Sequence, residues 1–193
     1  GIHSYRSITS WQEIAEKVFP RASYKELKKS YRTTIEIMNE ANKLLDKLPY
    51  DFPVVEPIVR HGEMPRYIQY ENIERWAEGV ARQTAKWREE GYHTFAIITK
   101  TVSDARIAHR VLHEKGYEAC LLEEKMSIPK EEVVIVPSYL SKGLEFDCVI
   151  AFSYDEVYRE ENETDLKLLY VTMTRAMHRL QLTSKEEGAF ILG

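Results

Sequence analysis

The hydrophobic pattern of the chain changes about halfway along its length. In the first part, apolar residues recur every three or four positions, which is the spacing of one face of an amphipathic helix. Three helices are predicted from this spacing. They begin near Thr9 or Ser10, near Thr33 or Thr34, and at Glu71, and the third ends at Gly91. The proline-rich residues 50–70 separate the last two helices and favour loops and edge strands.

From residue 95 onwards, short runs of continuous apolar residues alternate with helical patterns. Such runs predict strands covered on both faces, because a strand with one wet face alternates apolar and polar residues. Strands that alternate with helices indicate a parallel sheet of the α/β class. The predicted strands are 95–98, 119–122, 133–136, 148–152 and 180–183, and the predicted helices are 102–115 and 165–176.

The composition limits the classes of protein that need to be considered. The 193 residues include 27 basic and 31 acidic side chains, and the formal net charge is -4. We therefore expect one large domain. The charge argues against a protein that coats nucleic acid through bulk positive charge, but it is compatible with a local basic groove. No apolar run reaches the roughly 18 residues of a membrane span. Cys120 and Cys148 lie in apolar strand patterns, which predicts buried free thiols and a reducing, cytoplasmic location.

The first segment that packing alone does not explain is SYRTT at residues 30–34, directly before the second predicted helix. Tyr31 offers a ring that can stack on a base, and Arg32 offers a guanidinium that can bind phosphate oxygens. A helix N-terminus also favours anions. The alternative is a tyrosine buried by its ring and an arginine paired with a nearby glutamate.

Two further polar segments lie in the second half of the chain. VPSYLSKGLEFD at residues 136–147 follows the carboxyl end of a predicted parallel strand, the edge where open α/β sheets bind ligands. Gly143 permits close approach of the backbone and Lys142 can meet a phosphate, but a plain strand connection is the alternative. LLYVTMTRA at residues 168–176 includes Arg175, and its alternative is a core helix whose arginine stabilises the helix dipole.

In their order, spacing and residue identities, these segments resemble motifs IV, V and VI of the UvrD/Rep-like helicases of superfamily one. The most specific matches are SKGLEFD at residues 141–147 and LYVTMTRA at residues 169–176, and YRTT at residues 31–34 supports them. The resemblance extends over residues 27–182. It implies that residues 1–193 form a single RecA-like lobe, a parallel sheet with helices on both faces. In that family, ATP binds in the cleft between this lobe and a second one.

The resemblance also implies a role for each matched residue. Tyr31 matches an aromatic residue that packs against adenine, and Glu145 matches a carboxylate that contacts the ribose. Arg32 and Arg175 match two arginines that reach the γ-phosphate, so both are expected to be catalytic arginine fingers. Gly143 is expected to border the ATP pocket. The residues expected to couple this pocket to nucleic acid are Tyr139, Ser141 and Lys142.

The parts that cradle phosphates and hold Mg²⁺ are missing from the sequence. No GxxxxGK[ST] phosphate loop occurs, and no Asp-Glu pair stands in a Walker-B-like strand context. The chain also begins at Gly1 rather than at methionine. We therefore expect the C-terminal lobe of a longer protein, in which the N-terminal lobe holds the Mg²⁺ of ATP and without which ATP is not hydrolysed. No metal site is expected in this chain, because His109 and His113 have no third ligand nearby.

Two departures from the UvrD/Rep pattern bear on the partner. Pro137 and Tyr139 replace a threonine and a histidine that usually precede the Ser-Lys-Gly of motif V. Only ten residues separate Leu122 from Val133, too few for the helical subdomain that UvrD and Rep insert there. The sequence is in these respects similar to the HelD group, helicase-IV-like ATPases that bind RNA polymerase and recycle it. The expected partners are the N-terminal lobe, together with single-stranded DNA, RNA polymerase or both.

Two functions of other classes compete with a motor lobe. A non-catalytic docking lobe is one, but such a lobe has no reason to keep all the residues that match the ATP site. A small-molecule enzyme on an α/β sheet is the other, but the sequence holds no nucleophile elbow, metal-ligand spacing or dinucleotide fingerprint. The leading hypothesis is therefore the second motor lobe of an ATP-dependent helicase or translocase.

Overall fold

The computed structural model describes residues 33–51, 60–122 and 133–193. Within these ranges, six strands form one sheet in the order β1-β6-β5-β2-β4-β3, and every neighbouring pair is parallel. The strands are β1 (Arg66–Gln69), β2 (Phe95–Thr99), β3 (Ala119–Leu121), β4 (Val133–Pro137), β5 (Phe146–Ser153) and β6 (Ala176–Ser184). The predicted parallel α/β sheet is therefore confirmed.

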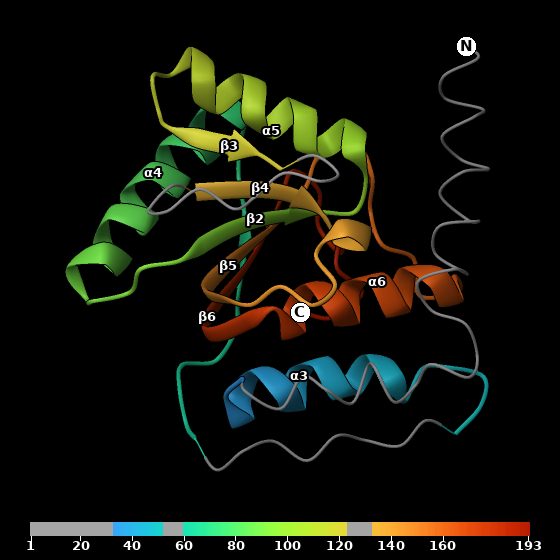
Figure 1. The fold of residues 1–193 in the computed structure, drawn as a ribbon. Coiled ribbons are helices and arrows are strands. Elements are labelled where there is room, and N and C mark those ends of the chain that lie inside the picture. Colours follow the sequence, from blue (N-terminus) through green and yellow to red (C-terminus); the bar gives the residue numbers. More distant parts are fainter. Residues whose placement is uncertain (1–32, 52–59, 123–132) are drawn as a thin grey trace.

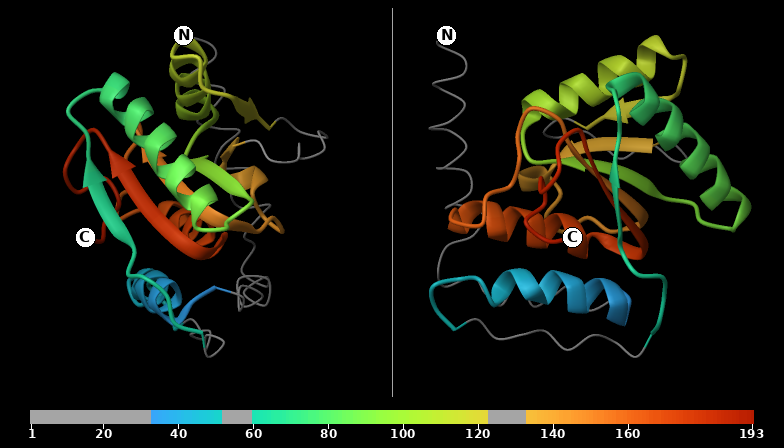
Figure 2. Two further views of the ribbon diagram at one scale, coloured as in Figure 1. Left: turned by 90° about the vertical axis from the view of Figure 1, so that its left-hand side faces the viewer. Right: turned by 180° about the vertical axis from the view of Figure 1, so that it is seen from behind.

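Helices cover both faces of this sheet (Figure 1). They are α3 (Ile35–Leu45), α4 (Ile73–Glu89), α5 (Val102–Glu114) and α6 (Glu163–Thr174), with a short 3₁₀ helix, η2 (Ser138–Leu140). One face carries α4 and α5, and the other carries α6 with α3 packed against it. Figure 2 shows the same layers from two other sides, with β1 at the edge of the sheet next to β6.

The ends of these helices follow from local chemistry. Each α-helix begins at a residue whose side chain accepts a hydrogen bond from a backbone N–H of the first turn, and such a cap contributes about 1 kcal/mol. The caps are Thr34 for α3, Asn72 for α4, Thr101 for α5 and Asn162 for α6. After α4, the chain turns at Gly91 with a φ of +101°, a conformation that glycine adopts without strain. Gly91 was predicted to end its helix, and of the two predicted starts, Thr33 and Thr34, the structure has Thr34.

The two layers of helices pack on opposite sides of the same strands. Along β2, Ala96 and Ile98 belong to the core under α3 and α6, whereas Phe95 and Ile97 belong to the core under α4 and α5. All four side chains are at most 2% exposed. Burying each large apolar side chain contributes roughly 1.5–3 kcal/mol, so the continuous apolar run reflects two cores rather than one.

Some sequence predictions are corrected or fall outside the described ranges. Cys148 is buried in central β5, as predicted, but Cys120 is only half-buried. The reason is that Cys120 lies in β3, which among the described strands stands at the edge of the sheet with β4 as its one neighbour. The helix predicted near Thr9 or Ser10 lies outside the described residues. No helix in the described ranges has the length and apolar character needed to cross a membrane.

The connection from β4 to β5 determines the arrangement of the candidate site. The two strands lie on either side of β2, so residues 138–145 must cross from the carboxyl edge of the sheet to its amino edge. Apart from the single turn of η2, this connection contains no helix. It runs beside α6, because Ser138 at its start bonds to Leu168 and Leu144 near its end bonds to Arg175.

Candidate functional site

The predicted site residues lie in three places. Tyr31 and Arg32 lie outside the described residues, and the structure begins just after them with buried Thr33 and Thr34. Tyr139 stands in η2, next to the carboxyl end of β4. The remaining residues follow the connection to the amino end of β5 or stand at the end of α6. The members of this set are Ser141, Lys142, Gly143, Glu145 and Arg175.

Glu145 and Arg175 are brought together at the amino edge of the sheet. Each residue directly precedes a strand, Glu145 before β5 and Arg175 before β6, and these strands are neighbours. The N–H of Phe146 donates to the carbonyl of Arg175 at 2.9 Å, which joins the two strand starts. The sequence had suggested a ligand at the carboxyl edge, after β4. The connection does begin at that edge, but it has crossed to the amino edge before it reaches Glu145.

The guanidinium of Arg175 is folded against its own lobe. Its Nε donates to the carbonyl of Val171 at 3.0 Å, and Nη1 donates to the carbonyl of Leu144 at 3.2 Å. Only 9% of the residue is exposed. This burial lowers the pKa of Arg175 to about 10, while the nearby carboxylate of Glu145 acts in the opposite direction. Arg175 therefore keeps its positive charge at neutral pH and lies buried beside an exposed carboxylate.

The residues predicted to couple to nucleic acid differ in accessibility. Lys142 is exposed and Tyr139 is half-buried against the core under α6. Ser141 is fully buried, and its Oγ donates to the carbonyl of Ser138 at 2.7 Å, which closes the turn of η2. Gly143 has a φ of +81°, so a glycine is required for the chain to turn there without strain. Lys142 and Tyr139 are thus the members of this set that a large ligand can reach.

A cavity of about 430 Å³ opens beside Glu145 at the same amino edge. Its remaining lining residues are Arg60, Thr94, Phe146, Asp147, Met177 and His178. The carboxylate of Asp147 accepts from the N–H groups of His93 at 2.8 Å and Thr94 at 3.2 Å, which fixes the starts of β5 and β2 together. Burial lowers the pKa of His178, and the charge of Arg60 adds to this effect. The sequence did not reveal this cavity, because its lining comes from separate segments.

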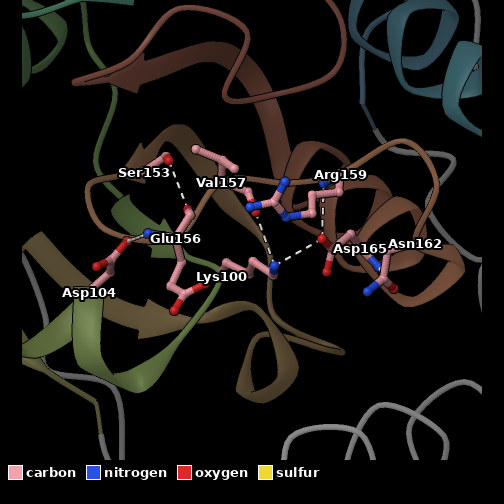
Figure 3. A network of polar contacts seen from close by, with 8 residues as sticks. All are labelled: Lys100, Asp104, Ser153, Glu156, Val157, Arg159, Asn162 and Asp165. Atoms are coloured by element: carbon pink, nitrogen blue, oxygen red, sulfur yellow. Dashed lines mark hydrogen bonds and ion pairs between the residues drawn. The ribbon is translucent and has the colours of Figure 1, made fainter. Parts of the chain in front are cut away.

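A buried polar network at the opposite edge holds the loop between β5 and α6 (Figure 3). Lys100 Nζ donates to Asp165 Oδ2 at 2.9 Å and to the carbonyl of Val157 at 3.0 Å. Asp165 is 1% exposed and Lys100 is 8% exposed. The same Asp165 oxygen accepts from the N–H of Arg159 at 2.9 Å. The network therefore fixes the start of the helix that ends at Arg175.

A second buried carboxylate, Asp104, binds the first residues of this loop. Asp104 accepts from the N–H groups of Tyr154, Asp155 and Glu156, and burial nevertheless raises its pKa. Asp155 and Glu156 are adjacent acids close to a strand, but they do not stand in a Walker-B-like strand context, because Tyr154 separates them from the end of β5. Both side chains are exposed.

No metal site is found in the part of the chain that the structure describes. No three or more His, Cys, Asp or Glu side chains there are grouped closely enough to hold an ion. His109 and His113 face each other on α5 with ring centroids 6.3 Å apart, and two imidazoles alone do not complete a typical protein metal site.

Comparisons with known proteins agree with this architecture. Residues 132–183, which contain the second and third segments, match the UvrD-like helicase C-terminal domain. The structure resembles the C-terminal domain of a possible DNA helicase from Lactobacillus plantarum WCFS1 with a TM-score of 0.63 and 30% sequence identity, covering 80% of this chain and 86% of that one. No curated protein matches the chain.

Two further solved structures resemble the chain more weakly. The C-terminal domain of the DEAD-box protein Dbp5 has a TM-score of 0.45 and 11% identity, covering 66% of this chain and 79% of that one. An arterivirus nonstructural protein 10, a helicase in complex with DNA, has a TM-score of 0.42 and 10% identity, covering 76% of this chain and 30% of that one.

Proposed function

We infer that this chain, which belongs to the family of UvrD-like helicase C-terminal domains, is the second motor lobe of an ATP-dependent DNA helicase or translocase. One observation carries the proposal. Glu145 and Arg175, which come from segments thirty residues apart in the sequence, meet at the starts of β5 and β6. An exposed carboxylate and a buried, charged guanidinium thereby lie side by side on one edge of the lobe, where a ligand held against that edge would meet the carboxylate first.

Each side chain has a defined task in the proposed ATP site. Arg175 stabilises the negative charge that develops on the transferring phosphoryl group, for which arginine is well suited because it is always charged and binds oxygens in a bidentate manner. To reach a phosphate, its Nη1 exchanges the carbonyl of Leu144 for a phosphate oxygen. Glu145 accepts hydrogen bonds from the ribose hydroxyls, and Gly143 borders the pocket. Arg32 supplies the second guanidinium and Tyr31 stacks on adenine.

The remaining parts of the ATP site belong to a second lobe. Mg²⁺, when bound with ATP, neutralises charge on the phosphates. The described residues offer no grouped ligands for it, and the sequence has no phosphate loop. We therefore propose that an N-terminal lobe of the same polypeptide holds the metal and the phosphates, and that this chain alone does not turn over ATP.

Nucleic acid is the proposed partner of the connection between β4 and β5. Lys142 is exposed there and can pair with a phosphate of the strand, while the ring of Tyr139 can stack on a base. The same connection continues to Glu145 and lies against Arg175. Contact with a strand and contact with ATP are thus made by one continuous segment.

A HelD-like ATPase that remodels or recycles RNA polymerase is the second candidate. The observation that favours it is the connection of only ten residues between Leu122 and Val133, which has no room for a helical subdomain. The presence of Tyr139 where UvrD and Rep have a histidine agrees with it. A docking lobe without catalysis is a third candidate, and it predicts a full-length protein that does not hydrolyse ATP.

Steady-state ATP hydrolysis by the full-length protein, with and without single-stranded DNA, tests the proposal. A helicase or translocase is expected to hydrolyse ATP faster when DNA is present. Rapid hydrolysis that DNA does not change favours the polymerase-remodelling candidate, and purified RNA polymerase is then added to the same assay. A folded full-length protein that hydrolyses no ATP under any of these conditions contradicts the motor-lobe proposal.

A further inference from the structure

The connection between β4 and β5 is attached to α6 at its start by two buried hydroxyl groups. Ser138 Oγ donates to the carbonyl of Leu168 at 2.8 Å, and Thr172 Oγ1 lies 3.0 Å from both Ser138 Oγ and that carbonyl. Ser138 and Thr172 are completely buried. Ser138 Oγ donates its one proton to the carbonyl of Leu168, so Thr172 is the donor in the hydrogen bond between the two hydroxyls.

The same connection is attached to α6 a second time, near its end. Arg175 Nη1 donates to the carbonyl of Leu144 at 3.2 Å, and Arg175, the C-cap of α6, follows Thr172 by three positions. The residues between the two attachments include the exposed Lys142 and the half-buried Tyr139. One turn of α6 therefore sets the positions of both ends of the segment that we propose to contact nucleic acid.

The hydroxyl of Thr172 differs from those of other buried threonines in helices. Thr174 Oγ1 donates within α6, to the carbonyl of Tyr170 at 2.8 Å. Thr84 in α4 likewise bonds to the carbonyl of Val80 at 3.0 Å. Such bonds to a preceding turn satisfy the hydroxyl within its own helix, and the further contact of Thr174 Oγ1, which accepts from Arg175 Nη2 at 3.3 Å, is with the next residue in sequence. Thr172 also reaches a side chain 34 positions away in sequence, across the boundary between a helix and a connection.

We propose that Thr172 is a positioning residue. Its hydroxyl bonds to Ser138 and thereby fixes the position of the connection, which carries Tyr139 and Lys142, relative to the last turn of α6 before Arg175. Binding of a strand to the connection then changes the placement of Arg175, and with it the rate of ATP hydrolysis. This inference rests on the proposed motor function, and it adds a specific contact by which the nucleic-acid side and the ATP side of the lobe are joined.

The test uses the full-length protein and the ratio of its ATP hydrolysis rates with and without saturating single-stranded DNA. Thr172→Val keeps the shape of the side chain and removes the hydroxyl. We expect it to lower this ratio about fivefold, which corresponds to one ordinary hydrogen bond. Ser138→Ala is expected to give at least as large a loss, because it removes the bond to Thr172 and also the bond to the carbonyl of Leu168. The double variant is expected to lose no more than Ser138→Ala, because the bond between the two hydroxyls is already absent there.

Two matched variants separate positioning from general packing. Thr172→Ser keeps the hydroxyl and is expected to retain most of the stimulation. Thr84→Val removes a buried helical hydroxyl of the same kind on the other face of the sheet, and it is expected to leave the ratio unchanged. A second readout is amide hydrogen exchange of residues 139–145, which is expected to become faster in Thr172→Val and to stay at the wild-type rate in Thr84→Val.

Several results overturn the inference, and they are distinguishable from failure of the proposed function. Wild-type stimulation in Thr172→Val, or an equal loss in Thr84→Val, shows that this hydroxyl has no positioning role. If DNA does not change the rate of ATP hydrolysis by the wild-type protein, the inference is also overturned, because strand binding and hydrolysis are then not coupled. The motor-lobe proposal still stands in that case if Arg175→Ala abolishes turnover. Absence of any ATP hydrolysis by the wild-type protein overturns both.

Discussion

Removal of the Asp165 carboxylate is expected to be among the most damaging single changes to the fold. The side chain is 1% exposed, and one of its oxygens accepts from Lys100 Nζ and from the N–H of Arg159, each at 2.9 Å. In Asp165→Ala, the Lys100 ammonium stays buried and keeps the carbonyl of Val157 as an acceptor at 3.0 Å. The N–H of Arg159 loses the carboxylate that accepts from it.

The expected loss of stability follows from this geometry. Removing one partner of a buried ion pair costs about 3–5 kcal/mol, because the other charge is left without compensation. That loss is a large fraction of the 5–15 kcal/mol that typically separates folded from unfolded domains. The double variant Lys100→Met with Asp165→Leu is expected to be more stable than Asp165→Ala, since it removes both charges and refills the space with apolar atoms.

Urea unfolding of the chain, followed by tryptophan fluorescence, measures these free energies. Trp76 and Trp87 are 1% and 3% exposed in the core under α4 and α5, so unfolding changes their surroundings. Asp155→Ala is the matched control, because Asp155 is an exposed acid of the same loop, and it is expected to change stability by less than about 0.5 kcal/mol. A loss below about 1 kcal/mol in Asp165→Ala would refute the reasoning, since that is the worth of an ordinary hydrogen bond.

Two further changes test local features of the fold. The carboxylate of Glu36 accepts from His61 and from the N–H of Gly62, which together lower its pKa from 4.5 to about 2. The contribution of Glu36 to stability is therefore present above pH 4.5 and is lost as the pH falls towards 2. In urea titrations at a series of pH values, Glu36→Gln is expected to remove that part of the pH dependence, and an unchanged pH profile contradicts this. Gly143→Ala places a side chain at a φ of +81° with no atom within 4 Å of the new Cβ, so a loss of roughly 1–2 kcal/mol from backbone strain alone is expected, and no loss at all contradicts it.

The sequence predicted the local elements well, because their causes are local. The helix predicted from Glu71 is α4, which begins two residues later at Ile73 and ends before the predicted turn at Gly91. The apolar run of β2 indicated correctly that both its faces are covered. The position of β3 at an edge depends instead on which strands pair over long distances. For that reason Cys120, in an apolar run like that of Cys148, was wrongly predicted to be buried.

The candidate site was predictable only in part, for a similar reason. The resemblance indicated Glu145 and Arg175, and the structure brings them together at two neighbouring strand starts. It could not indicate that the guanidinium of Arg175 bonds to the carbonyl of Leu144, because that contact joins residues 31 positions apart. Nor could it indicate the contact of Ser138 with Thr172, since a hydroxyl in an apolar stripe reads as ordinary helix packing.

Turnover of ATP by the full-length Arg175→Ala variant tests the motor-lobe proposal most directly. We expect the maximal rate to fall by a factor of about 10³ while ATP still binds, because an arginine finger acts mainly on the transition state. Arg179→Ala, which changes a half-buried arginine of β6 outside the candidate site, is the control and is expected to hydrolyse ATP at nearly the wild-type rate. A folded Arg175→Ala protein with a near-wild-type rate would contradict the proposal that this lobe completes an ATP site.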